Sequence, residues 1–122
     1  YGTRNMASIA GLAEGIKFLE KISMENVESR CRELHNYFRS LLGNEMEIIS
    51  PKKDQFNTGI ITIRHPKLIH NEFPQYSLDK LGYKVRGIYE ADLHGIRISC
   101  AVYNSESELK RFADVILDYV KG

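Results

Sequence analysis

Residues 95–104 constrain the fold more than any other part of this 122-residue chain, because their side chains alternate with a period of two. One set of alternate positions is apolar: Ile96, Ile98, Cys100 and Val102. The other set carries Arg97, Ser99, Ala101 and Tyr103. Strict alternation over this length predicts a β-strand with one buried face. The small neighbours of Arg97 leave space around its guanidinium on the other face.

Two interpretations of Arg97 stay open from the strand alone. A guanidinium is a planar fork that can bind a carboxylate at two points, so Arg97 can grip an acidic group of a ligand. Alternatively, it is an ordinary arginine on a solvated sheet face.

The strand is followed by a well-marked helix start. Ser105 and Glu108 have the spacing of a capping box, in which each side chain binds a backbone N–H of the other residue. Apolar residues then recur at helical spacing, which predicts a closing helix over residues 106–121. Its apolar stripe consists of Leu109, Phe112, Ala113, Ile116 and Val120.

Periodicity and turn residues predict the remaining elements. Helices are predicted over residues 6–22 and 24–42, and strands over residues 46–50, 57–64 and 83–89. Residues 66–82 give the weakest pattern: a few helical turns interrupted by Pro74 and ending at Gly82. The predicted order is α-α-β-β-α-β-β-α. Short connections favour hairpins, so we predict an α+β fold with a small, mostly antiparallel sheet of about four strands and helices packed on one face.

Composition limits the class of protein. Apolar residues make up 43% and charged residues 27% of the chain, as in an ordinary globular domain, and one domain is expected over residues 1–122. The net charge of +1 predicts neither a nucleic-acid nor a membrane-surface partner. No secretory signal pattern or long apolar run is present, which favours a cytoplasmic location. Cys31 and Cys100 occupy apolar positions and are expected to be buried free thiols, and no metal-binding spacing occurs.

Two segments together resemble the small domain of class V aminotransferases. Arg97-Ile98-Ser99, with Tyr103-Asn104 and an acidic, amphipathic last helix, is similar to the close of that domain. At the other end, Gly2-Thr3-Arg4-Asn5 resembles the family's Gly-Thr-x-Asn segment, and the two matches stand in the family's order. These are fold-type I enzymes that depend on pyridoxal phosphate, and they include cysteine desulfurases, epimerase-like proteins and C–S lyases.

The resemblance implies roles for particular residues. Arg97 matches the arginine that binds the α-carboxylate of an amino-acid substrate. Thr3 and Asn5 match positions near the cofactor phosphate held by a neighbouring subunit, which implies a homodimer. Arg86, in the facing strand, is either a second cation at this site, or it is solvated or paired with Glu90 or Asp92. His94 either contacts substrate or is an ordinary histidine of a surface loop.

Two absences narrow the chemistry. No lysine has the local pattern of the family's Schiff-base lysine, and the chain begins at Tyr1 rather than Met. We therefore expect a C-terminal fragment that carries no catalytic residue, is inactive alone, and joins an N-terminal large domain. The loop at residues 90–94 contains no cysteine, which disfavours a desulfurase that forms a persulfide and leaves transamination, C–S lyase or epimerase chemistry open. The rival interpretation is a stand-alone α+β module that binds a ligand or a protein without catalysis.

Overall fold

A computed structural model describes residue 2 and residues 4–53 and 56–122. Its helices are α1 (Met6–Ile22), α2 (Met24–Leu42), α3 (Phe73–Leu81) and α4 (Glu106–Lys121), with a short 3₁₀ turn at Glu90–Asp92. Its strands are β1 (Glu47–Ile48), β2 (Ile60–Arg64), β3 (Arg86–Ile88) and β4 (Gly95–Ser99). The described elements follow the predicted order, and the α+β class is confirmed. No described helix is both long and apolar enough to span a bilayer.

The strands form one antiparallel sheet in the order β1-β2-β4-β3, so β2 and β4 are central. Four isoleucines of these two strands face each other in register and are almost fully buried: Ile61 opposite Ile98, and Ile63 opposite Ile96. Because successive side chains point to opposite faces, Thr62 and Arg97 lie on the other face of the same strands. We call these the covered face and the open face.

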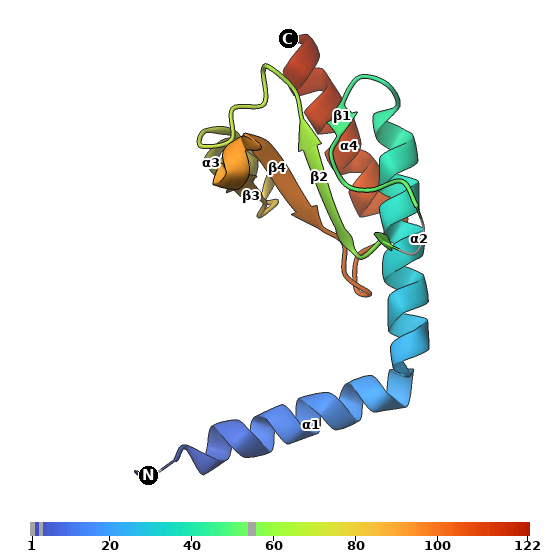
Figure 1. The fold of residues 1–122 in the computed structure, drawn as a ribbon, viewed down its shortest axis with the longest axis vertical. Helices are drawn as coiled ribbons and strands as arrows, with labels where there is room; N and C mark the ends of the chain where they lie inside the picture. The colour runs from blue at the N-terminus through green and yellow to red at the C-terminus, as the bar shows by residue number, and fades with distance from the viewer. Residues whose placement is uncertain (1, 3, 54–55) are drawn as a thin grey trace.

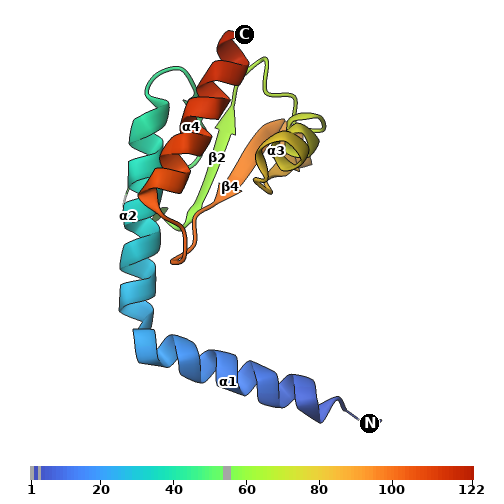
Figure 2. The same cartoon turned by 180° about the vertical axis from the view of Figure 1, so that it is seen from behind.

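Helices α2 and α4 lie side by side against the covered face, whereas α3 sits beside the β3 edge (Figures 1 and 2). Phe112 of α4 joins these layers, since its ring centroid lies 6.1 Å from that of Phe38 in α2 and 4.6 Å from that of Tyr83 before β3. The predicted stripe of α4 is buried at every position, and the capping box of Ser105 and Glu108 is formed. The core is therefore built from one face of the sheet and the apolar stripes of two helices.

Helix α1 is different, because none of its residues is buried. Figure 1 shows it projecting away from the sheet beyond the start of α2. Ser23 separates the two helices with a φ of 68°, and its hydroxyl oxygen accepts a hydrogen bond from the backbone N–H of Asn26. Large apolar side chains along α1 are left exposed: Met6, Ile9, Leu12, Ile16, Phe18 and Leu19.

The bounds of α3 and of all four strands differ from the predicted ones. Pro74 does not interrupt a helix; it lies in the first turn of α3, where its missing N–H has no helical partner to lose, and Gly82 ends the helix at a φ of 72°. Strand β4 stops at Ser99 because the Asn104 side chain accepts a hydrogen bond from the Ala101 N–H at 2.8 Å and forms a turn. Strands β1, β2 and β3 each cover only part of their predicted ranges, 46–50, 57–64 and 83–89.

Gly87 in β3 explains how the chain packs at this edge. A β-carbon built on Gly87 would lie 1.7 Å from the backbone oxygen of His70, so any side chain would collide with main chain. The segment before α3 therefore lies directly against β3, and only glycine permits that approach.

Candidate functional site

The open face places Arg97 at the centre of a row of three strands. Its cross-strand partners are Thr62 on β2 and Arg86 on β3. Arg97 is half-buried, and its Nε atom is buried without a hydrogen-bond acceptor among the described residues. The Arg97 guanidinium also forms no ion pair with any described residue. A buried N–H that lacks an acceptor is costly unless a ligand supplies one.

A pocket of about 250 Å³ lies beside this arginine and is lined by Lys84, Val85, Arg86, Arg97 and Ser99. Three of these side chains are cationic and no acidic side chain lines the pocket. Like charges that are neighbours across two strands repel each other, so the arrangement costs energy in the absence of a counter-charge. The pocket is therefore suited to an anion.

Arg86 already has part of its counter-charge. Its Nη2 donates to Glu90 Oε1 at 2.8 Å, which confirms the pairing that the sequence offered as one of two interpretations. Backbone N–H groups at Glu90 and Tyr89, together with the Arg86 guanidinium, hold the pKa of the Glu90 carboxyl below its usual value. Arg97 and Lys84 have no such partner among the described residues.

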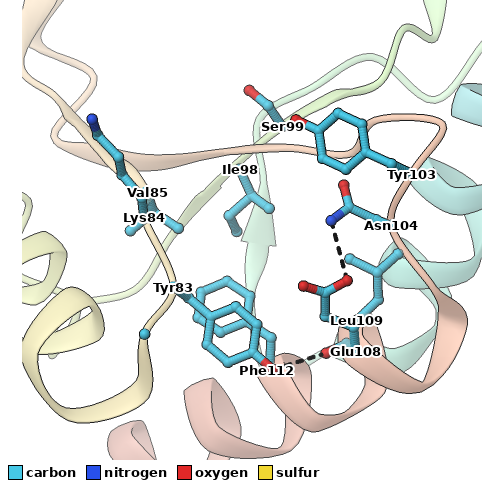
Figure 3. A pocket seen from close by; sticks show the side chains of 11 residues that line it. Tyr83, Lys84, Val85, Ile98, Ser99, Tyr103, Asn104, Glu108, Leu109 and Phe112 are labelled. Atoms are coloured by element: carbon cyan, nitrogen blue, oxygen red, sulfur yellow. Dashed lines mark hydrogen bonds between the residues drawn. The ribbon is translucent and has the colours of Figure 1, made fainter.

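A second pocket of about 200 Å³ adjoins the first and shares Lys84, Val85 and Ser99 with it. Figure 3 shows its deeper wall, where Tyr83, Leu109 and Phe112 lie on the core side of the strand. Lys84 and Ser99 are directed to the opposite side from these rings (Figure 3). Asn104 and Glu108 both line this pocket, and the Asn104 Nδ2 atom donates a hydrogen bond to Glu108 Oε2 at 3.2 Å.

The loop before β4 is held in an unusual conformation. Ala91, Asp92 and His94 all have positive φ, a region that non-glycine residues rarely occupy. His94 Nε2 lies 2.6 Å from Asp92 Oδ1, and the His94 ring lies 4.9 Å from the ring of His70. His94 is exposed, and these two contacts fit the interpretation of a surface-loop histidine. The contact with His70 could not be found from the sequence, because 23 intervening positions separate the two residues.

The sequence predicts two buried free thiols, and the structure confirms this for Cys100 but only in part for Cys31. Cys100 is buried. The pKa of its thiol is raised to about 11, mainly by this burial and to a smaller extent by the nearby Cys31 thiol. Such a thiol is almost entirely protonated at neutral pH and is a poor nucleophile. Cys31, expected to be buried, is only partly so. Among the described residues, no group of His, Cys, Asp and Glu side chains is arranged to hold a metal ion.

The amino-terminal positions give a partial result. The Asn5 side chain caps α1, its Oδ1 atom accepting a hydrogen bond from the Ser8 N–H at 3.1 Å. The first turn of α1 contains no acidic residue. Thr3, the other position assigned to the cofactor phosphate, lies outside the described residues.

Comparisons with known proteins agree with this architecture. The family model for class V aminotransferases matches residues 1–112. Probable cysteine desulfurases from Pyrococcus abyssi and Borreliella burgdorferi are 31% and 30% identical over 99% and 91% of this chain, which covers 32% and 29% of their lengths. An apo cysteine desulfurase structure from Thermococcus onnurineus superimposes with a TM-score of 0.88 at 27% identity, over 99% of this chain and 32% of that one.

The chain thus spans about a third of the length of the relatives it matches. The ordered pair of end motifs, the four-stranded sheet and the family match all give the same assignment. This chain belongs to the class V aminotransferase family of pyridoxal-phosphate-dependent enzymes.

Proposed function

We propose that this chain is the C-terminal domain of a class V aminotransferase-like enzyme and that Arg97 binds the α-carboxylate of its amino-acid substrate. The observation that supports this most strongly is the state of Arg97: half-buried, with an unsatisfied Nε, in a pocket of cations. A substrate carboxylate would supply the missing acceptor and counter-charge in one step. The bidentate contact fixes the orientation of the substrate, which is what Arg97 contributes to the reaction.

The residues present suit one part of the cofactor, its phosphate. The start of α1 offers backbone donors, the Asn5 cap and no acidic side chain, which together favour an anion. We assign Thr3 and Asn5 to that phosphate, reached from a neighbouring subunit of a homodimer. When bound, pyridoxal phosphate supplies an electron sink for negative charge that develops at the substrate Cα. Every lysine side chain is exposed, so we place the Schiff-base lysine in an N-terminal large domain.

Helix α1 supports the existence of that large domain as a partner. Its exposed apolar residues form far more unburied surface than α2 or α4 shows. Contiguous exposed apolar surface in a globular protein commonly marks a contact with another domain or chain. We assign the apolar side of α1 to the contact with the large domain.

The reaction type follows from what the loop before β4 lacks. It contains no thiol, and the buried, protonated Cys100 cannot replace one. We therefore propose transamination, C–S lyase or epimerase chemistry rather than persulfide formation, although the relatives are named probable cysteine desulfurases. Incubating the complete enzyme with cysteine should leave no sulfur covalently bound to this domain, as measured by intact mass spectrometry.

The role of Arg97 is tested in the complete protein loaded with pyridoxal phosphate, by titrating amino acids against the cofactor absorbance. Arg97→Ala is expected to weaken amino-acid binding by about 2–5 kcal/mol, which is roughly 30-fold or more. Arg97→Lys keeps the charge but loses the fork, so it should restore binding only in part. Arg64→Ala is the matched control, because Arg64 lies on the same face and is paired with Glu47 through two contacts of 2.8 Å.

Unchanged amino-acid affinity in Arg97→Ala would contradict the proposed role. Failure of the complete protein to bind pyridoxal phosphate at all would favour the rival interpretation, a module without catalysis.

A further inference from the structure

The cations beside Arg97 exceed what one substrate carboxylate can balance. Glu90 neutralises Arg86, and the α-carboxylate of the proposed function neutralises Arg97. Lys84 lines the same pocket and forms no ion pair or hydrogen bond with any described residue. One positive charge in the pocket therefore has no assigned partner.

The geometry of the sheet places this charge beside the carboxylate site. Arg86 lies opposite Arg97 in register. Lys84 precedes Arg86 by two residues, Ser99 follows Arg97 by two, and both line the same pocket as the two arginines. Lys84 and Ser99 are therefore a second pair of polar residues in this pocket.

The surroundings of this second pair suit an anion rather than a neutral polar group. Figure 3 shows Lys84 and Ser99 directed to the same side, away from the aromatic core. The Lys84 ammonium and the Ser99 hydroxyl offer donors and a positive charge, and no acidic side chain lines this pocket. Glu108 lines the adjoining pocket, where its carboxylate accepts hydrogen bonds from Asn104 and Ser105.

We propose that the enzyme's substrate is an amino acid with a second anionic group, an amino dicarboxylate. Arg97 binds its α-carboxylate, and Lys84 with Ser99 binds its side-chain carboxylate. This inference rests on the proposed function, because it takes the α-carboxylate site at Arg97 as given. It adds the class of substrate and names Lys84 as the residue that determines specificity.

The test compares acidic amino acids with their amides, aspartate with asparagine and glutamate with glutamine, in the complete enzyme with pyridoxal phosphate. The wild type should show a higher kcat/KM for the acid than for the amide of the same length. Lys84→Met should lower the ratio of the two values by about 10- to 100-fold, as expected for the loss of one charge-assisted contact. Lys84→Arg should retain a preference for the acid, and Lys84→Glu should reverse it. Lys80→Met, at an exposed position of α3 outside the pocket, is the matched control and should leave the ratio unchanged.

The outcomes separate the two proposals. If Arg97→Ala weakens binding of every amino acid while Lys84→Met leaves the acid-to-amide ratio as in the wild type, the specificity inference is wrong and the proposed function stands. If Arg97→Ala weakens none of them, the proposed function fails and the inference fails with it. A wild type that favours amides over acids also overturns the inference.

Discussion

The same strands build both faces of the sheet, because successive side chains along each strand point to opposite faces. On the covered face, Ile61 and Ile98 meet across β2 and β4 and are sealed by α2 and α4. On the open face, Thr62 and Arg97 meet across the same strands and remain accessible to a ligand. The first arrangement buries its isoleucines by packing, whereas the second leaves the buried Nε of Arg97 without an acceptor and the charges of Arg97 and Lys84 without a partner among the described residues. Stability is thus concentrated on one face, and the capacity for binding on the other.

The largest effect is expected where the covered face is opened. Phe112→Ala removes a ring that contacts both Phe38 and Tyr83, leaving a cavity between α4, α2 and the sheet. The expected cost is about 3–5 kcal/mol in the free energy of unfolding, measured by equilibrium urea denaturation of the chain.

The control for this substitution is Tyr103→Ala, because Tyr103 is 85% exposed in the turn before α4. That change should alter the unfolding free energy by less than about 0.5 kcal/mol. Equal losses in the two variants would show that the covered face does not carry the stability of the fold.

The covered side also contains a titratable histidine, so the stability of the fold should depend on pH. His35 of α2 is 1% exposed, and burial first, then the Arg39 charge, lowers its pKa from 6.5, opposed by the backbone at Thr58 and Ile60. The folded chain therefore binds this proton less readily than the unfolded chain does. Stability should be complete above about pH 6.5 and should fall as the pH drops from there towards the lowered pKa.

Urea denaturation at a series of pH values tests this dependence. His35→Leu removes this titratable group. As the pH falls below about 6.5, the unfolding free energy of the variant should therefore rise relative to that of the wild type. Parallel curves for the two proteins would contradict a buried, neutral His35.

A smaller effect is expected at the start of α4, which holds the covered face closed. The Ser105 hydroxyl accepts a hydrogen bond from the Glu108 N–H at 3.2 Å, and the Glu108 carboxylate accepts one from the Ser105 N–H at 3.4 Å. Ser105→Ala should cost about 1 kcal/mol in the unfolding free energy, and Ser105→Asp should recover most of it. Arg111→Ala, at an exposed position of the same helix and without a contact to Ser105, is the control. A loss as large in Arg111→Ala as in Ser105→Ala would argue against the cap.

The covered face was more predictable from the sequence than the open face, for a physical reason. The stripe of α4, the capping box and the isoleucines of β2 and β4 depend on periodicity and on neighbours within one turn or strand. The sequence also placed Arg97 opposite the apolar face and offered Glu90 as a partner of Arg86. What escaped prediction depends on distant parts of the chain: the main chain of His70 packed against Gly87, and the pairing of its ring with His94. The end of β4 escaped because the Asn104 turn overrides an alternation that continues to Tyr103.

The smallest effect on stability is expected at the residue with the largest expected effect on binding. Arg97→Gln removes a charge that faces Arg86 across two strands and an Nε that has no acceptor, so little favourable energy is lost. The unfolding free energy should change by less than about 0.5 kcal/mol, with any change towards greater stability, since like charges that face each other across strands are unfavourable. Arg64→Gln is the matched control on the same face; it breaks the pair with Glu47 and should be slightly destabilising. A large loss of stability in Arg97→Gln would mean that Arg97 supports the fold, and its unsatisfied state would then no longer argue for a ligand. A neutral result, together with weakened amino-acid binding in the complete enzyme, would show that this arginine contributes to binding and not to the fold.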